Sequence, residues 1–166
     1  GQPTPLGYYP DTFGNMGQTA QMMQLAGLDT VAFGRGVTPT GLNNQVSHGD
    51  FDSTYSEMWW QGPDASKVLG ILFANWYSNG NEIPVDPTEA KTYWDQKLAD
   101  AERYAATPDL LFMNGVDHQP VQQDLSKALA TARELYPDYE FIHSNFADYI
   151  KALKADLPED LSTIHG

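Results

Sequence analysis

Along the chain, short apolar runs typical of strands alternate with segments in which apolar residues recur at helical spacing. This pattern predicts strands and helices in turn. Residues 7–9 end a short extended segment, because Pro10 pushes the residue before it toward an extended backbone. Residues 18–26 contain no glycine and predict a short helix that Gly27 can end. Residues 28–33 form a β-rich apolar run. This strand, helix, strand order favours a parallel α/β sheet.

The middle of the chain contains a hairpin pattern. Aromatic and aliphatic runs at 55–61 and 67–74 flank a five-residue turn at 62–66, which is typical of a β-hairpin. Trp59 and Trp60 lie in the first run, and we assign them to the core because aromatic side chains most often fill cores. The hairpin is therefore an insertion between successive βα units.

Residues 38–54 are rich in Gly, Asn, Ser and Thr and lack periodicity, so they predict a loop. Within it, His48, Asp50 and Asp52 alternate as metal ligands on one face of a strand would. A solvated polar loop is the better interpretation, because spacing alone is a weak indication of a metal site.

The second half begins with a strong helix start, in which Asp86 is the N-cap, Pro87 lies in the first turn and Glu89 completes a capping box. An apolar stripe continues this helix to Thr107. The remaining pattern predicts a buried strand at 109–113, a helix at 121–135, a strand at 139–143 and a short helix at 146–153. We find no internal repeat and predict one α/β domain.

Composition narrows the function. Twenty-two acidic residues against nine Lys and Arg give a net charge of -13, which disfavours nucleic acid and anionic membranes as partners. The chain contains no Cys, so disulfides and thiolate metal sites are excluded. It also shows no export leader and no apolar run of membrane length. We therefore expect a cytoplasmic protein.

Two acids follow predicted strands and are candidates for catalysis. Asp11 and Asp117 lie at the expected carboxyl ends of separate parallel strands, where such sheets assemble their sites. Glycoside hydrolysis uses a pair of carboxyl groups of this kind. Residue types alone favour a structural alternative, in which Asp11 caps the next helix and Asp117 makes an Asx-turn before Pro120.

Four sequence blocks carry a resemblance. They are residues 8–18 (YYPDTFGNMGQ), 33–37 (FGRGV), 75–80 (NWYSNG) and 113–121 (MNGVDHQPV). In this order they resemble consecutive blocks of bacterial glycoside hydrolase family 38 α-mannosidases. The resemblance implies a zinc-dependent retaining exo-α-mannosidase whose catalytic domain is an irregular parallel β/α barrel.

The resemblance also implies residue roles. Asp11 matches the catalytic nucleophile, which is also a zinc ligand, and Asp117 matches the general acid/base. Arg35 matches a basic residue near the nucleophile, while Trp76 and Asn79 lie in a block that helps to form the sugar subsite. The implied partner is an α-mannoside oligosaccharide. In this mechanism Asp117 must carry a proton before it acts.

The family's enzymes are several times longer than this chain, and their other zinc ligands come from an earlier strand and a later helical domain. His118, His143 and His165 stand in contexts unlike that later block. We therefore expect residues 1–166 to be a single domain, the C-terminal portion of a catalytic barrel. By itself it should be inactive and poor in zinc, whereas the full-length enzyme holds the metal.

Two alternatives remain open from sequence. A non-catalytic carbohydrate-binding domain would bind mannose weakly through Trp76, Tyr77 and Asn79 and would not hydrolyse it. A metal-dependent polysaccharide deacetylase would release acetate and leave glycosidic bonds intact. The sequence leaves the linkage preference, the natural substrate and the oligomeric state of the full-length protein open, and an oligomer is compatible with it.

Overall fold

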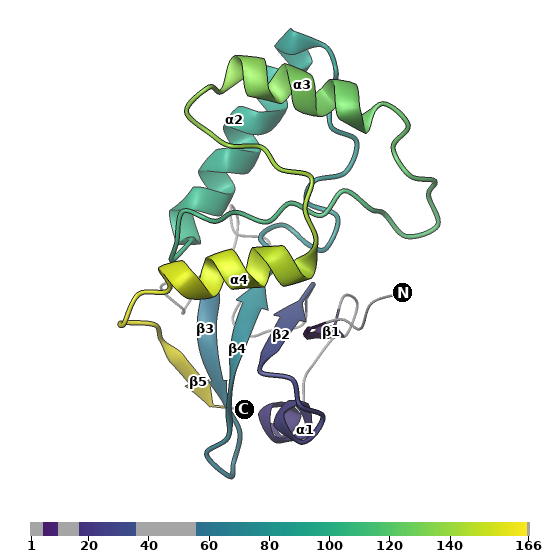
Figure 1. The fold of residues 1–166 in the computed structure, drawn as a ribbon. Helices are drawn as coiled ribbons and strands as arrows, with labels where there is room; N and C mark the ends of the chain where they lie inside the picture. The colour runs from purple at the N-terminus through teal and green to yellow at the C-terminus, as the bar shows by residue number, and fades with distance from the viewer. Residues whose placement is uncertain (1–4, 10–16, 36–55, 166) are drawn as a thin grey trace.

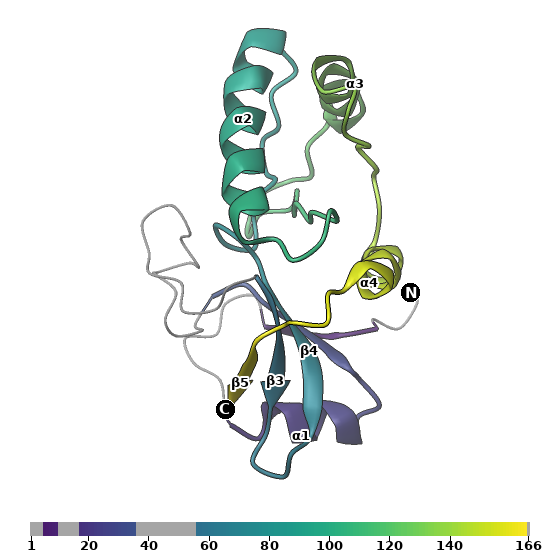
Figure 2. The ribbon, with the colours of Figure 1, turned by 90° about the vertical axis from the view of Figure 1, so that its left-hand side faces the viewer.

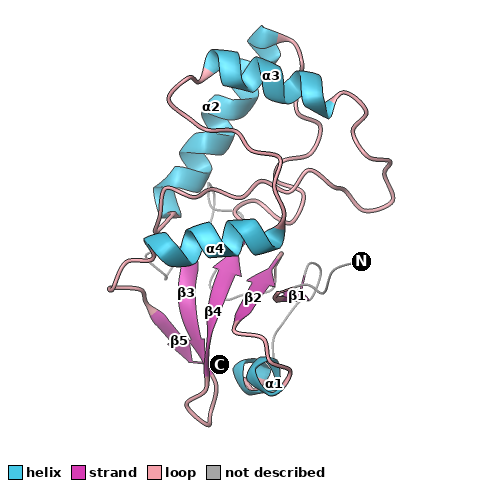
Figure 3. Ribbon diagram, in the orientation of Figure 1, coloured by secondary structure: helices cyan, strands magenta, loops and turns pink. Residues whose placement is uncertain are grey.

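The fold was obtained as a computed structural model, which describes residues 5–9, 17–35 and 56–165. Figure 1 shows how the strands and helices are arranged along the chain, and Figure 3 shows the same view by secondary structure. The strands are β1 (Gly7–Tyr9), β2 (Thr30–Phe33), β3 (Glu57–Gln61), β4 (Lys67–Leu72) and β5 (Thr163–His165). The helices are α1 (Thr19–Leu25), α2 (Pro87–Tyr104), α3 (Leu125–Leu135) and α4 (Phe146–Asp156).

The described strands form a mixed sheet in the order β1-β2-β4-β3-β5. Strands β1, β2 and β4 are parallel, with Tyr9 beside Phe33 and Phe33 beside Leu72. Strand β3 is antiparallel to β4, and β5 pairs in parallel with β3. The register places the carboxyl ends of β1, β2 and β4 at one edge of the sheet.

Each face of the sheet is covered by one helix, because alternate strand residues point to opposite faces. Val31 and Phe33 belong to the cluster that includes Ala20 of α1. Ala32 belongs to the cluster that includes Tyr149 and other residues of α4. We call the five strands with α1 and α4 the sheet part.

Helices α2 and α3 form a second layer with its own core, visible beyond the strands in both views (Figures 1 and 2). Trp94 of α2 is 2% exposed and makes edge contacts with Phe112 and Phe141. The predicted cap is confirmed, since the Asp86 carboxylate accepts hydrogen bonds from two backbone N–H groups of the first turn. We call α2, α3 and residues 105–124 between them the helical part.

Much of the predicted α/β pattern is confirmed, including the hairpin and all four helices. The sheet is mixed rather than wholly parallel, because the hairpin reverses β3. The described strands give an ordered sheet, and the irregular barrel stays a prediction. The predicted loop at 38–54, with His48, Asp50 and Asp52, lies outside the described residues.

Two predicted strands are wrong. Residues 109–113 form no strand, because other partners pair with their backbone groups. The Asn79 amide donates to the Leu111 carbonyl and accepts from the Met113 N–H, and the Met113 carbonyl accepts from the Gly80 N–H. Residues 139–143 also lack a ladder, and the Phe141 carbonyl accepts hydrogen bonds from the Arg133 guanidinium at 2.8 and 3.1 Å. Strand β5 was not predicted, since three residues are too few to establish a period.

Within the described ranges, each helix is either too short or too polar to cross a bilayer.

Candidate functional site

Arg35 and Trp76 meet at the carboxyl edge of the parallel strands. Arg35 follows β2 and Trp76 follows β4, and the guanidinium carbon lies 5.9 Å from the centroid of the indole ring. This distance permits a cation–π interaction. Strand β1 ends at the same edge with Tyr9, whereas Asp11 lies outside the described residues.

The backbone at Trp76 is strained. Asn75 and Trp76 have φ values of 59° and 80°, in the left-handed region that non-glycine residues rarely occupy. Such residues cost about 1–3 kcal/mol each and cluster at functional sites. The Asn75 side chain is held by a 2.8 Å hydrogen bond to the Asp100 carboxylate of α2. The strain therefore supports a functional role for this turn.

The Trp76 side chain presents both an aromatic surface and a hydrogen-bond donor. Its ring lies 4.5 Å from that of Tyr77 at an interplanar angle of 60°. Its buried indole N–H has no acceptor within the part of the chain that the structure describes. The indole N–H groups of Trp60 and Trp94 are also buried without an acceptor there, and what distinguishes the Trp76 N–H is its place beside Arg35 at the carboxyl edge of the sheet, where ligands of parallel sheets bind.

Tyr8 of β1 lies close to the turn after β4, and the sequence analysis gave it no role of its own. Its ring lies 5.9 Å from Phe73 and 5.6 Å from Phe146, and 39% of the residue is exposed. Burial, and then the proximity of Tyr77, raise the pKa of the Tyr8 phenol. A three-residue strand gave no periodic signal that could have singled it out.

Asn79 has a bracing position. It is 3% exposed, and its amide donates to the carbonyls of Ala74 at 2.9 Å and Leu111 at 3.3 Å. Its carbonyl oxygen accepts from the Met113 N–H at 2.8 Å. The side chain thus joins the turn after β4 to the helical part, and its predicted sugar contact stays a prediction.

Asp117 lies on a loop of the helical part, immediately before α3. Its side chain is 65% exposed, and its carboxylate lies 3.3 Å from Nε2 of His118, which is 91% exposed. His118 also has a left-handed φ of 58°. The structure therefore brings Arg35 and Trp76 together and places Asp117 on a separate loop. Whether Asp11 faces Asp117 lies beyond the described residues.

The base of this loop is tied by two amide side chains. Nδ2 of Asn114 donates to Oε1 of Gln122 at 3.0 Å and to the Gly80 carbonyl at 2.9 Å. Oε1 of Gln122 also accepts from the Ile83 N–H at 3.0 Å. The sequence gave no sign of this role, because Gln122 falls inside the predicted helix at 121–135.

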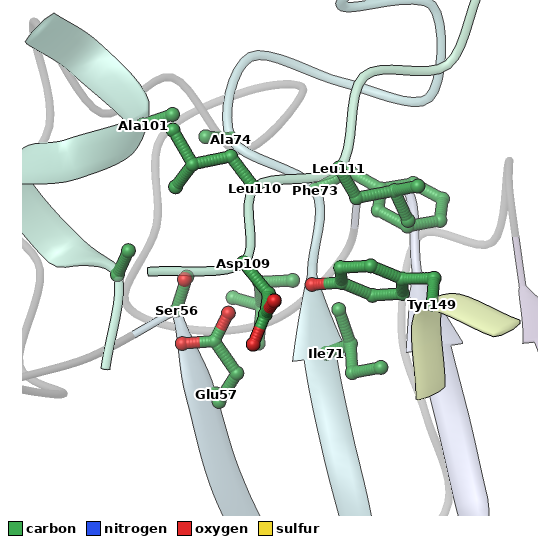
Figure 4. Close-up of a pocket in the computed structure, with 12 residues that line it drawn as sticks. Ser56, Glu57, Ile71, Phe73, Ala74, Ala101, Asp109, Leu110, Leu111 and Tyr149 are labelled. Carbon is green, nitrogen blue, oxygen red and sulfur yellow. The ribbon is translucent and has the colours of Figure 1, made fainter. Parts of the chain in front are cut away.

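A small pocket lies between the sheet part and the helical part (Figure 4), and the predicted site residues that the structure describes do not line it, although Asn79 bonds the carbonyls of Ala74 and Leu111 in its wall. Figure 4 shows the carboxyl groups of Glu57 and Asp109 turned toward one another, with the Tyr149 hydroxyl pointing toward the same space. Burial raises the pKa of Glu57, and one of its oxygens accepts from the Ala106 N–H at 2.9 Å. Burial, and then the neighbouring Asp156, raise the pKa of Asp109.

The described residues do not by themselves fit a zinc ion. Across residues 5–9, 17–35 and 56–165 the structure contains no group of three His, Asp or Glu side chains that could hold a metal. Stable zinc sites need three or four protein ligands. Asp11, the predicted ligand, is outside these ranges, and the described residues alone supply no zinc site.

Comparisons with known proteins agree on one family. The sequence profile of the glycosyl hydrolases family 38 N-terminal domain matches residues 1–166. A candidate mannosylglycerate hydrolase of Halalkalibacterium halodurans is 58% identical over 161 residues, which is 97% of this chain. An α-mannosidase from Enterococcus faecalis V583 has a crystal structure that is similar at 64% identity, with a TM-score of 0.90 over the whole chain.

A second Enterococcus faecalis structure, of a protein in glycosyl hydrolase family 38, is 51% identical over 99% of this chain with a TM-score of 0.72. The chain spans 18% of the length of the Halalkalibacterium halodurans relative and of the first Enterococcus faecalis protein, and 15% of the second.

Proposed function

Because the chain belongs to glycosyl hydrolase family 38, we propose that it contributes both catalytic carboxyl groups to a retaining α-mannosidase. Its solved and curated relatives support this class, since they include an α-mannosidase and a candidate mannosylglycerate hydrolase. Their similarity extends over almost the whole of this chain. A non-catalytic binding domain or a deacetylase has no comparable support.

The observation that carries the proposal is the convergence at one sheet edge. Arg35 and Trp76 follow the carboxyl ends of β2 and β4, and the parallel β1 ends beside β2. Asp11 follows the last residue of β1 by two positions in the sequence. Active sites of parallel α/β sheets form at this edge, so a nucleophile at position 11 fits its neighbours.

We assign the chemistry to the two acids. The Asp11 carboxylate attacks the anomeric carbon while Asp117 donates its proton to the leaving oxygen, which breaks the glycosidic bond and forms a mannosyl ester. The Asp117 carboxylate then takes a proton from water, whose oxygen displaces Asp11 and restores the original configuration. Such a mechanism needs the two carboxyl groups about 5 Å apart.

Arg35, Trp76 and Asn79 surround this chemistry in distinct ways. The Arg35 guanidinium keeps positive charge next to the aromatic surface of Trp76, on which a sugar ring can stack. The indole N–H is a donor suited to a sugar hydroxyl. Asn79 holds the turn in place through its three backbone hydrogen bonds.

Zinc enters the proposal only through the full-length protein, with Asp11 as one ligand and the others outside this chain. The 166-residue chain alone should then be inactive and should retain no stoichiometric zinc. Metal analysis after dialysis tests this, with roughly one zinc per chain expected for the full-length protein. Tight zinc binding and hydrolysis by the 166-residue chain alone would contradict it.

The acid role is tested with Asp117→Asn in the full-length enzyme. General acid catalysis contributes about 10²–10⁴-fold, and it matters most for leaving groups that are poor. We expect kcat/KM on an alkyl α-mannoside to fall by about that factor, while the first step on a dinitrophenyl α-mannoside changes far less. Equal activity of both enzymes on the alkyl mannoside would contradict the assignment of Asp117.

A second candidate substrate comes from the Halalkalibacterium halodurans relative, whose name specifies a mannosyl bond to glycerate. The same two carboxyl groups would cleave that bond, and only the group beyond the scissile oxygen would differ. Comparing kcat/KM for α-mannosyl oligosaccharides and mannosylglycerate in the full-length enzyme separates the two. A strong preference for mannosylglycerate would replace the oligosaccharide proposal while leaving the catalytic residues unchanged.

A further inference from the structure

We propose that Asn114 and Gln122 are positioning residues that hold the loop 115–121 where Asp117 can reach the leaving oxygen. We call these two amide side chains and the hydrogen bond between them the clamp. This inference rests on the proposed function, in which Asp117 is the general acid/base. The two amides stand at either end of residues 115–121, and the hydrogen bond between them closes the base of that loop. Asn114 lies in the block 113–121 and Gln122 directly follows it, but the resemblance gives neither residue a role.

Gln122 is the centre of the clamp because each polar group of its amide is used. Oε1 accepts from Ile83 N and Asn114 Nδ2, both at 3.0 Å. Nε2 donates to Ile83 O and to the Asp124 carboxylate, both at 2.8 Å. A primary amide has two donor hydrogens and two acceptor sites, so this side chain is fully satisfied in one orientation.

Asn114 connects the clamp to the turn that carries the sheet-edge residues. Its amide donates to the Gly80 carbonyl, and the Gly80 N–H in turn donates to the Met113 carbonyl at 2.9 Å. Gly80 ends the block 75–80 that contains Trp76 and Asn79. The loop with the acid is thereby fixed directly to the segment with the sugar-binding aromatic surface.

The rest of the loop offers little packing. Residues 117–121 are exposed, with Val121 at 78%, and the tip contributes a 3.4 Å bond from Gln119 N to Val116 O. An exposed loop whose ends are fixed loses less entropy when its tip must be placed. The clamp therefore sets the position of the Asp117 carboxyl group. A displacement of a catalytic group by about 1 Å can lower the rate a hundredfold.

The test compares two neighbouring glutamines in the full-length enzyme. Gln122→Met keeps the length of the side chain and removes its hydrogen bonds. Gln123→Met is the matched control, because Gln123 is exposed and, among the residues that the structure describes, its side chain bonds only the Val121 carbonyl of its own loop, at 3.4 Å. Asn114→Ala is a second variant, which removes the closing bond and leaves Gln122 in place.

The readout is the ratio of kcat/KM on an alkyl α-mannoside to kcat/KM on a dinitrophenyl α-mannoside. Loss of folded enzyme lowers both values equally, whereas a misplaced acid lowers the first alone. We expect Gln122→Met and Asn114→Ala to lower the ratio about tenfold and Gln123→Met to leave it unchanged. If Gln122→Met yields no soluble enzyme, Asn114→Ala decides the question alone.

The Asp117→Asn variant separates the two ways of being wrong. If Asp117→Asn lowers the ratio strongly but the clamp variants leave it at the wild-type value, the positioning inference is wrong and the proposed function stands. If Asp117→Asn itself leaves the ratio unchanged, Asp117 is not the acid, and both the proposed function and this inference fail.

Discussion

The sheet part and the helical part hold their functional residues by different means. Arg35 and Trp76 project from strand ends whose places are set by backbone ladders and by the parallel register of β1, β2 and β4. Asp117 lies in the helical part, where the amides of Asn79, Asn114 and Gln122 fix the chain. In the proposed site Asp11 follows β1 and Asp117 lies in the helical part. A substitution in one part can therefore disturb one of the two carboxyl groups and leave the other in place.

The largest expected effect comes from Trp94→Ala, which should loosen the helical part alone. Trp94 is 2% exposed and central to the α2–α3 core, and removing such a side chain costs about 3–5 kcal/mol. Hydrogen exchange in the full-length protein should show lost protection in α2 and α3, with β2 and β4 unchanged. Gln96→Ala, at an exposed position of α2, is the control.

Equal loss of protection in the strands would show that the two parts unfold together. The two parts would then differ in the contacts that hold their residues but not in their local stability.

The next effect tests the junction between the parts through two glycines. A Cβ on Gly80 would lie 2.8 Å from Cβ of Phe112 and 3.0 Å from its carbonyl carbon, whereas one on Gly115 would meet nothing within 4 Å. We expect Gly80→Ala to destabilise the protein by about 1–3 kcal/mol through overpacking. Gly115→Ala should stay within about 0.5 kcal/mol in the same urea titration.

Hydrogen bonding makes the Gly80 result informative for function as well. Since Gly80 bonds to Met113 and Asn114, its displacement should also lower the ratio of rates on poor and good leaving groups. Overpacking that changes stability but leaves this ratio intact would show that the Asp117 loop is placed independently of the junction.

A smaller effect concerns Glu57, which joins β3 to the end of α2 through the Ala106 N–H. Burial raises its pKa above the ordinary value of 4.5, so the unfolded chain releases the proton more readily. The associated stability is therefore full below pH 4.5 and is lost as the pH rises through the raised value. Glu57→Gln retains an acceptor and should flatten this decline in Tm between pH 4.5 and neutrality.

The matched variant is Asp64→Asn in the exposed hairpin turn, where Ser66 lowers the pKa of the carboxyl. It should leave the decline above pH 4.5 in place. The same decline in Glu57→Gln and wild type would show that Glu57 does not hold a proton in the folded protein.

The smallest effect is expected within the sheet part. Lys154 of α4 lies 2.7 Å from the Asp29 carboxylate, and this hydrogen bond is the main cause of the lowered pKa of Asp29. Its contribution is present above pH 3.8 and lost as the pH falls, opposite in sign to that of Glu57. Because Asp29 is largely exposed, Asp29→Asn should cost about 0.5 kcal/mol or less.

Sequence pattern predicted the elements whose signals are local. The cap at Asp86 and the apolar stripe after it identified α2, and the turn at 62–66 identified the hairpin. It failed where side chains replace backbone partners. The apolar run 109–113 has the composition of a buried strand, but the Asn79 amide pairs with the Leu111 carbonyl and the Met113 N–H, and no period in the sequence indicates such a contact.

The site divides in the same way. Arg35 and Trp76 were selected through the family resemblance of the blocks 33–37 and 75–80, and the structure brings them together. The role of Gln122 was not predicted. One partner, the backbone of Ile83, lies 39 positions away, and the other, Asn114, is an amide with no motif that marks it. Bracing amides of this kind become visible only when both segments are placed in space.

The account depends most on Asp11 as the nucleophile, and trapping the covalent intermediate tests it most directly. A fluorinated mannosyl fluoride that forms the ester faster than water removes it should add one sugar to the full-length enzyme. Peptide mass spectrometry is expected to find that sugar on the peptide containing Asp11, and Asp11→Asn should remain unlabelled. A label on another residue, or turnover through an unlabelled enzyme with inversion at the anomeric carbon, would contradict the account.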